Sequence, residues 1–411
     1  MLKENAITQY IKENWDKTIW DNKDDRNGDS FVWLKKPYTV PCIQEQFTIF
    51  FYWDTYFANL GLFIHDRAEQ VENNLDNMQF FIKRLGYIPN ASRLINRSQP
   101  PVFTRGVYDL YKFKQDKSVI EKYLDDVLAE LQFWKNDRMT PCGLSAYKHS
   151  ATNTYLIQFC DTIGKRLDLS KESGINRISL GADLLAIAES GWDFNPRFMT
   201  ENNRFAASEF AHLELNCLLY DAERKAAEMA AIVDRKDDAK RLYQEAATRK
   251  ALMDRFMKDE KSGVYYDYNF KTGTLSKVLS CASLYVYALG ISDDKNAAKA
   301  VLERLELPHG IAACEEVKGE PLFQWGYPSM WPTNIYFAAL GLDRLGLKEE
   351  GFRVAKKYTD CVENVFGKTG TLWEKYDAQL GAVSVTAEYK TPAMLGWTAG
   401  IYLFLKDYYS Y

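Results

Sequence analysis

The sequence predicts an all-α protein that folds as a single domain over its 411 residues. Apolar side chains recur at three- and four-residue spacing through most of the chain, as they do on the buried face of an amphipathic helix. Alternation of apolar and polar residues, which marks a half-buried strand, is scarce. No Pro- or Ser-rich linker divides the chain, so we expect one domain over residues 1–411, with a helical lead-in over residues 1–35.

Helical patterns follow one another along the chain, separated by segments rich in turn residues and tyrosine. They are clearest over residues 117–137, 178–187, 212–234, 236–257, 332–346 and 348–366. No close repeat of 30 to 45 residues is present, which argues against an open solenoid. A closed ring of paired helices fits the pattern, with functional side chains on the loops at one end.

Charge and hydropathy exclude several classes of function. The 52 Lys and Arg residues are interleaved with 56 Asp and Glu residues, so we expect no basic surface for nucleic acid. The N-terminus lacks an apolar signal region, and no uncharged apolar run reaches about 18 residues. We therefore expect a soluble, cytoplasmic protein without a membrane partner, either a monomer or a weak homo-oligomer.

The cysteines and histidines show no pattern of a disulfide framework or a metal site. The seven cysteines are scattered without a CxxC pair, so buried free thiols are expected. The four histidines lie far apart and form no HxH, HxxxH or HExxH motif. We expect neither a metal nor a cofactor, although this pattern leaves a calcium site made of carboxylates open.

Aromatic residues make up 14% of the chain, including 10 Trp and 26 Tyr. A large helical core explains such a content; the sharper interpretation is a pocket whose rings stack on sugar faces while polar neighbours bind hydroxyl groups. Several segments combine rings with Asp, Asn, Arg, Gln or Glu and with turn residues, as a polyhydroxyl ligand requires. They are FYWDTYF (51–57), YIPNASRLINRSQPP (87–101), AESGWDF (188–194), QWGYPSMWP (324–332), TLWEKYD (371–377) and VTAEYKTPAMLGW (385–397).

In this order, these segments resemble the signature motifs of the trehalase family of glycoside hydrolases. The matching residues are YWDTYF, PN with RSQPP, SGWDF, QW with WP, EKYD, and AEY followed by GW. The resemblance extends from about residue 40 to the C-terminus and is weakest over residues 140–175. It implies an (α/α)6 barrel with its active site on one face, and inverting hydrolysis of a small α-glycoside by two carboxylates.

The resemblance also implies roles for individual residues. Asp193 in SGWD matches the general acid and Glu388 in AEY matches the general base. Burial against rings such as Trp192 and Phe194 would keep Asp193 protonated, because a dry environment disfavours the charged form. Inversion requires the two carboxyl groups to be roughly 6.5–9.5 Å apart, with the attacking water between them. The residues expected to bind the sugar are Trp53, Asp54, Asn90, Arg97, Gln99, Trp192, Gln324, Trp325, Trp331, Glu374, Tyr389 and Trp397.

The sequence departs from the family at positions that shape the pocket. Where the family has a PGGRF-x-E run, this chain reads IQEQFTI, with Gln46 and Ile49 at the places of the arginine and the glutamate. Gly326 replaces an aspartate, Ser329 and Met330 replace Asn-Gly, and the central arginine-proline-glutamate run is missing. We therefore expect the reaction to be retained, with altered recognition of the leaving group.

Trehalose is the leading substrate, and another α-glucoside or α-mannoside, such as glucosylglycerate or mannosylglycerate, is the alternative. An acidic leaving group would need a cation nearby, for which Lys148, His149 and Lys390 are candidates. Two other classes stay open: a catalytically idle sugar-binding barrel, and a phosphorylase with a basic phosphate site in place of a catalytic base. Asp54 as a helix cap and Arg97 in a surface ion pair are the plain structural alternatives.

Overall fold

The computed structural model describes residues 4–21, 34–43, 47–167, 176–200, 204–318, 323–386, 389–393 and 396–410. Helices dominate the described residues, as the sequence predicts, and each strand found there is only two residues long. The predicted helical segments are confirmed: residues 117–137 form a single helix, and the patterns at 236–257 and 348–366 match helices almost to the residue.

The helices of the described residues are α1 Ala6–Thr18, α2 Tyr52–Ile64, α3 Ala68–Leu85, α4 Phe103–Lys114, α5 Lys117–Asp137, α6 Asn153–Arg166, α7 Arg177–Ser190, α8 Leu213–Ile232, α9 Lys236–Phe256, α10 Ala282–Ala288, α11 Lys295–Leu305, α12 Pro332–Arg344, α13 Lys348–Thr369 and α14 Gly396–Tyr408. The strands are β1 Ile19–Trp20, β2 Tyr38–Thr39, β3 Phe210–Ala211, β4 Tyr268–Asn269, β5 Thr274–Leu275, β6 Glu306–Leu307, β7 Gly310–Ile311, β8 Ser329–Met330, β9 Tyr376–Asp377 and β10 Ala382–Val383.

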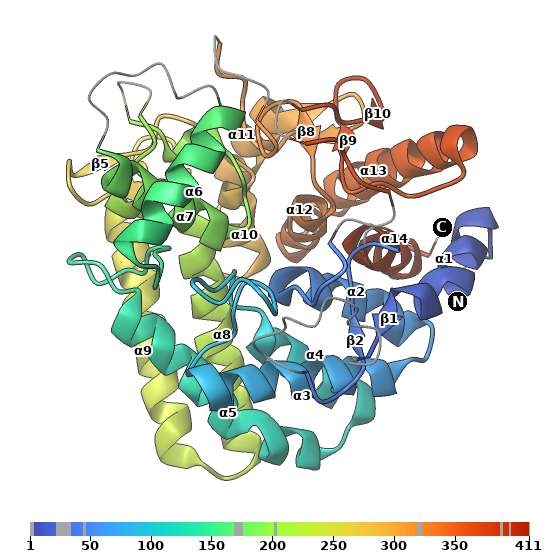
Figure 1. Ribbon diagram of the computed structural model, residues 1–411, viewed down its shortest axis with the longest axis horizontal. Helices are drawn as coiled ribbons and strands as arrows, with labels where there is room; N and C mark the ends of the chain where they lie inside the picture. The colour runs from blue at the N-terminus through green and yellow to red at the C-terminus, as the bar shows by residue number, and fades with distance from the viewer. Residues whose placement is uncertain are drawn as a thin grey trace.

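Helices α2, α4, α8, α10, α12 and α14 form a closed inner ring, in which each helix packs on the next and α14 returns to α2 (Figure 1). A second set lies outside them: α3 packs on α2 and α4, α5 on α4 and α8, α9 on α8, α11 on α10, α13 on α12 and α14, and α1 on α14. This arrangement is the predicted (α/α)6 barrel. Its inner helices are buried on nearly all sides and carry apolar residues around most of their circumference.

Helices α6 and α7 form a separate packed pair, drawn in green in Figure 1. Gly181 permits their close approach, because a Cβ atom at this position would lie 2.2 Å from the carbonyl oxygen of Leu156. Helix α7 ends at Gly191, whose φ of 71° is the left-handed conformation that glycine adopts most easily. The chain thus turns sharply after α7 and delivers Trp192 and Asp193 to the interior.

The short strands connect the loops at the barrel end. In one sheet β9 lies between β8 and β10, with Met330 opposite Tyr376 and Asp377 opposite Ala382. Sequence patterns did not predict these strands, because two residues are too few to show alternation.

Buried side chains form one large apolar cluster that runs through the ring. All seven cysteines are free, and all except Cys142 are buried, which confirms the expectation of unpaired thiols. Within the described ranges, no helix has the length and apolar character needed to cross a membrane.

Candidate active site

Trp53 and Asp54 lie in the first turn of the inner helix α2. Their side chains are 1% and 9% exposed. The backbone N–H of Trp53 donates to Oε1 of Gln99 at 2.9 Å, so the first turn of α2 is capped by a side chain of the RSQ segment. Asp54 does not act as an N-cap here, since the capping position belongs to Phe51. The predicted capping alternative for Asp54 is therefore not what the structure shows.

The segment 87–101 folds back on α2 and on the end of α7. The N–H of Asn90 donates to the carbonyl of Arg97 at 2.8 Å, and its side-chain amide donates to the carbonyl of Ala188 at 3.2 Å. The N–H of Tyr52 donates to the carbonyl of Asn90 at 3.1 Å. Two of the predicted sites, Asn90 and Arg97, are thus joined to each other and to both the α2 and the SGWD segments.

Glu189, immediately before SGWD, fixes this arrangement. Its carboxylate accepts hydrogen bonds from the guanidinium of Arg138 and from the backbone N–H groups of Ser98, at 2.8 Å, and Lys148, at 2.6 Å. Glu189 is fully buried, and a buried charge is tolerated only when it is paired and hydrogen-bonded in this way. The ion pair holds the RSQ segment and the 138–150 loop against the end of α7.

Gly191 places the SGWD turn against Trp53. A Cβ atom at Gly191 would lie 3.7 Å from Cδ1 of Trp53 and 3.8 Å from Nε2 of Gln99. Trp192 is fully buried, while the side chain of Asp193 is half-buried with Oδ1 in the interior. The three segments that carry Trp53, Gln99 and Asp193 therefore meet at one place.

Stacked indole rings connect this place to the QWGYPSMWP segment. Trp192 stacks on Trp325 with ring centroids 4.8 Å apart, and Trp325 stacks on Trp331 at 3.9 Å. The N–H of Trp325 donates to the carbonyl of Phe194 at 3.1 Å. The indole N–H of Trp331 donates to the carbonyl of Gln324 at 3.0 Å. These tryptophans are almost fully buried, so most of their surface supports the site from behind.

The C-terminal segments complete the cluster around Glu374. Its carboxylate accepts a hydrogen bond from the hydroxyl of Tyr389 at 2.7 Å and pairs with the ammonium of Lys375 at 2.7 Å. Its backbone carbonyl accepts from the indole N–H of Trp397 at 3.1 Å. The amide of Gln324 donates to the carbonyl of Tyr389 at 3.4 Å. Glu374, Tyr389, Trp397 and Gln324 are thus held in one hydrogen-bonded group.

The three carboxyl groups at this centre interact electrostatically. Burial raises the pKa of Asp193 to about 6, with a smaller upward effect from Glu374, while the guanidinium of Arg97 acts in the opposite direction. Burial, with Glu374 again adding to it, raises the pKa of Asp54 to about 8. Asp54 and Asp193 therefore retain protons more readily than ordinary aspartates, whereas Glu374 has a cation and a hydroxyl donor to stabilise its charge.

Several buried polar atoms around this centre have no hydrogen-bond partner among the described residues. They include the indole nitrogen of Trp53, Oδ1 of Asp193 and Nε of Arg97. Buried polar atoms are normally paired, and an exception calls for an explanation such as a ligand or water. Donors and acceptors of both kinds suit the hydroxyl groups of a sugar. By contrast, no group of three His, Cys, Asp or Glu side chains in the described residues is arranged to hold a metal ion.

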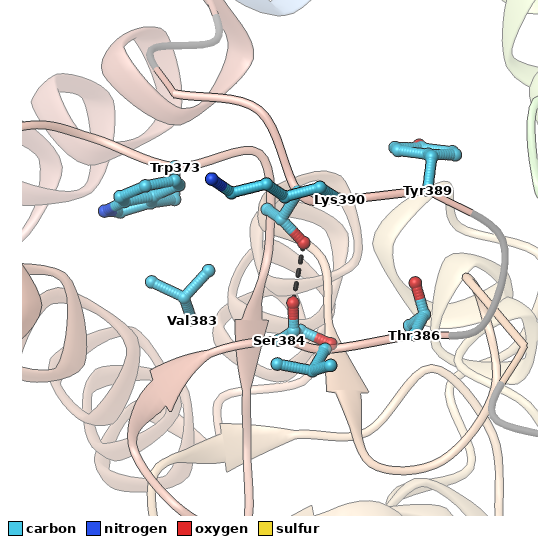
Figure 2. A pocket seen from close by; sticks show the side chains of 8 residues that line it. Trp373, Val383, Ser384, Thr386, Tyr389 and Lys390 are labelled. Atoms are coloured by element: carbon cyan, nitrogen blue, oxygen red, sulfur yellow. Dashed lines mark hydrogen bonds between the residues drawn. The ribbon is translucent and has the colours of Figure 1, made fainter.

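A pocket of about 530 Å3 is lined in part by Trp373 and Tyr389. Figure 2 shows Trp373 and Tyr389 at its opposite ends, with the side chain of Lys390 extending toward Trp373. Tyr389 connects this pocket to the hydrogen-bonded group around Glu374, because it lines the pocket while its hydroxyl donates to the Glu374 carboxylate. The complete lining is Trp373, Val383, Ser384, Val385, Thr386, Tyr389, Lys390 and Thr391.

Two of the departures from the family have a packing explanation. A Cβ atom at Gly326 would lie 3.2 Å from Cβ of Phe323, so a side chain as large as aspartate requires Phe323 to move. Ser329 and Met330 form strand β8, and the hydroxyl of Ser329 lies 2.9 Å from that of Ser384. Gln46 lies outside the described residues, and Ile49 is half-buried.

The structure brings together most of the residues that the sequence predicted for the site. Those joined by the contacts above are Trp53, Asp54, Asn90, Arg97, Gln99, Trp192, Asp193, Gln324, Trp325, Trp331, Glu374, Tyr389 and Trp397. Glu388, the predicted general base, lies outside the described residues. Its two described neighbours in the sequence are Thr386 and Tyr389, both of which line the pocket of Figure 2.

Sequence reasoning missed three charged residues that organise the site: Arg138, Glu189 and Lys375. A signal was present for two of them. Glu189 lies within the AESGWDF segment, and Lys375 follows Glu374 in EKYD. Neither stood out, because charged residues beside a motif are usually exposed. Nothing in the sequence indicates that Arg138 is the partner of Glu189, 51 residues away.

Comparison with known proteins identifies the family and the fold. A sequence model of the trehalase family matches residues 2–410. The structure is similar to that of the neutral trehalase from Saccharomyces cerevisiae, with a TM-score of 0.74 and 22% identity, covering 99% of this chain and 80% of that chain. It is also similar to the GH63 mannosylglycerate hydrolase from Thermus thermophilus in complex with glucose, with a TM-score of 0.68 and 14% identity, covering 97% of this chain and 99% of that one. The chain belongs to the trehalase family of glycoside hydrolases.

Proposed function

We propose that this protein hydrolyses a small α-glycoside with inversion at C1, and that trehalose is the substrate it prefers. The observation that carries the proposal is the meeting of Asp193, Asp54 and Glu374 at one aromatic-walled centre. A family match over almost the whole chain supports the same reaction class. Unpaired buried donors and acceptors around the carboxyl groups fit a hydroxyl-rich ligand.

Asp193 acts as the general acid in this proposal. Burial raises its pKa to about 6, so near neutral pH a useful fraction of the enzyme holds a proton for the departing oxygen. Arg97 acts in the opposite direction and limits the rise. A carboxyl group with a pKa near the working pH is both protonated often enough and acidic enough to transfer its proton.

Two carboxylates are candidates for the general base. The motif AEY indicates Glu388, and this remains our sequence-based proposal. The described geometry supports Glu374 as a second candidate, because its carboxylate pairs with Lys375, accepts a hydrogen bond from Tyr389 and interacts electrostatically with Asp193. Each carboxylate oxygen of Glu374 has a second lone pair, which can accept a hydrogen bond from an attacking water.

In this proposal, Trp53, Asp54 and Arg97 bind the reacting sugar. The indole N–H of Trp53 and Nε–H of Arg97 are donors without a described partner, and Asp54, with its raised pKa of about 8, can donate or accept. Asn90 uses its backbone and amide to hold Arg97 and the α7 end in register. Gln99 positions Trp53 through the backbone of α2.

The side chains needed to bind the leaving group depend on what the leaving group is. Glucose as the leaving group requires hydrogen-bonding partners, whereas glycerate requires a cation. Of the three cations considered from the sequence, Lys148 directs its ammonium to the carbonyl of Met139 at 2.9 Å, and Lys390 lines the pocket next to Tyr389. His149 accepts a hydrogen bond from the N–H of Ala151, and burial lowers its pKa, so Lys390 is the cation that would suit a glycerate group. The family match keeps trehalose in first place, with glucosylglycerate and mannosylglycerate as alternatives.

We also propose that the enzyme works in the cytoplasm as a single-domain monomer or weak homo-oligomer. The seven free cysteines support a reducing compartment.

A substrate panel tests the proposal. Purified protein is incubated with trehalose, sucrose, kojibiose, maltose, glucosylglycerate and mannosylglycerate, and released monosaccharide is measured with Asp193→Asn as the blank. Preference for trehalose supports the proposal, and turnover of only a glycosylglycerate assigns the alternative leaving group. Absence of turnover throughout indicates a sugar-binding barrel, and turnover that depends on added phosphate indicates a phosphorylase.

The identity of the base is tested separately with α-glucosyl fluoride, whose leaving group needs little protonation. Asp193→Asn is expected to retain much of its activity on this substrate, whereas loss of the base abolishes it. Glu374→Gln and Glu388→Gln are compared side by side. The variant that is inactive on the fluoride as well as on the natural glycoside identifies the base.

A further inference from the structure

Lys375 is a fully buried lysine at the edge of the reaction centre. Its side chain is 0% exposed, and the side chain of its ion-pair partner Glu374 is 3% exposed. The ammonium nitrogen lies 2.7 Å from Oε2 of Glu374. It also lies 4.9 Å from the centroid of the Trp331 ring and 4.8 Å from that of Tyr389, within the range of cation–π contacts.

Removing a lysine from water carries a large desolvation penalty, which an ion pair alone rarely recovers. If this side chain only filled space, methionine or leucine would fill the same space without the desolvation penalty of a charge. Here a carboxylate and two electron-rich ring faces surround the ammonium, so the position selects for positive charge. The positive charge stabilises Glu374, because among the described residues Glu374 is the only group that forms an ion pair with the Lys375 ammonium.

The remaining neighbours of Glu374 make such a cation necessary. Burial and, to a smaller extent, the charge of Glu374 raise the pKa of the carboxyl groups of Asp54 on α2 and Asp193 after α7. They raise the pKa of the Cys42 thiol as well. The hydroxyl of Tyr389 donates to Oε1 of Glu374 but carries no charge. Without Lys375, Glu374 would be a buried carboxylate without a counter-charge, which is strongly unfavourable.

We propose that Lys375 is a positioning residue that keeps the Glu374 carboxylate charged and fixed in orientation through their buried ion pair. This inference deepens the proposed function, since it takes the Asp193 and Glu374 centre as the site of reaction. Its first consequence, the charge state of Glu374, does not depend on which glycoside is cleaved.

The charge state is measured directly by NMR titration of protein labelled with 13C at the glutamate carboxyl carbon. Glu374→Gln identifies the signal of Glu374. Replacement of Lys375 by methionine, which has similar length and no charge, should raise the titration midpoint of Glu374. Lys250→Met, which removes the exposed Lys250–Asp254 pair on α9, is the matched control and should leave the midpoint unchanged. An unchanged midpoint in Lys375→Met overturns the proposal.

Kinetics supply the second readout. In Lys375→Met, kcat should fall by roughly 10- to 100-fold with little change in KM. The acidic limb of the pH profile should move up, because Glu374 becomes harder to ionise without its buried cation. Unfolding alone lowers the active fraction without moving either limb. A lower rate with a fixed acidic limb therefore contradicts the proposal.

Tyr389→Phe covers the case in which Lys375→Met does not fold. It removes the other hydrogen bond to Glu374 and leaves Lys375 in place, so both the NMR midpoint and the acidic limb should shift in the same direction by smaller amounts. If no glycoside is turned over, the proposed function fails while the NMR titration still decides the role of Lys375. If glycosides are turned over and the midpoint of Glu374 is unmoved in both variants, the proposed function stands and the role of Lys375 is rejected.

Discussion

The guanidinium of Arg138 and the carboxylate of Glu189 form a two-pronged ion pair in the interior of the protein. Nη2 of Arg138 lies 2.8 Å from Oε1 and Nε lies 2.9 Å from Oε2, and the two side chains are 3% and 0% exposed. Glu189 also accepts from the backbone of Ser98 and Lys148. Since SGWD follows directly, this pair sets where the acid Asp193 meets the RSQ segment.

Replacing Glu189 by glutamine is expected to destabilise the protein by about 3–5 kcal/mol, because Arg138 then remains buried without a counter-charge. Urea unfolding at pH 7 measures the change. Glu245→Gln is the control: Glu245 pairs with Lys135 at the surface, where such a pair is worth at most about 1 kcal/mol. If the two variants lower the free energy of unfolding equally, the Arg138–Glu189 pair contributes no more to stability than a surface pair.

Asp193→Asn is expected to reduce kcat by several orders of magnitude while the protein remains folded, since asparagine cannot supply the proton. Asp183 on α7 provides a matched control. It is also buried with a pKa raised to about 6, but it binds the backbone N–H of Ser208 at 3.0 Å and also its hydroxyl. Asp183→Asn should keep most of the activity. Full activity in Asp193→Asn would remove Asp193 from its role.

The pH dependence of kcat/KM should be bell-shaped, with the basic limb governed by Asp193 near pH 6. Burial raises the pKa of Asp193 to about 6, so the protonated, active form is lost as the pH rises through that value. The acidic limb follows protonation of the base at lower pH. Initial rates at low substrate concentration, between about pH 4 and 9, give both limbs. A flat profile would be incompatible with a two-carboxylate mechanism.

Glu130 should make the folded protein less stable as the pH rises. Burial raises its pKa to about 8 from an ordinary 4.5, against the lowering effect of the bond from the Tyr52 hydroxyl. Because the folded-state pKa lies above the unfolded value, this contribution is fully present below pH 4.5 and is lost as the pH rises through about 8. Glu130→Gln should flatten the fall in stability over this window. If the free energy of unfolding, measured in urea, falls equally steeply with pH in the variant and in the wild type, this prediction is wrong.

The fold was predictable because its evidence is local and repeated. Periodicity indicated the helices, and the resemblance carried by the ordered motifs indicated the barrel, which contacts between α2 and α14 close. The two-residue strands were not predictable, since pairs such as Met330 with Tyr376 form only after the loops have come together.

The candidate site was predictable to a lesser extent. Side chains named by motifs, such as Trp53, Gln99 and Asp193, do meet in the structure. The partners that hold them did not stand out, because an ion pair such as Arg138–Glu189 depends on segments far apart in the sequence. The sequence predicted Glu374 as a sugar-binding residue, and only the structure, which shows the buried cation of Lys375 beside it, makes it a second candidate base.

The most direct test of inverting hydrolysis is the configuration of the first sugar released. Proton NMR follows the C1 signal during the first minutes of trehalose cleavage, or of the best glycoside in the panel, before mutarotation mixes the anomers. The account predicts that the glycosyl unit appears first as the β-anomer, because water attacks the face opposite the departing oxygen. Since the leaving glucose of trehalose keeps its α configuration, trehalose should give β- and α-glucose in equal initial amounts, whereas retention would give α-glucose alone. Initial release of that unit as the α-anomer would contradict it, since retention requires a covalent intermediate on a nucleophilic carboxylate.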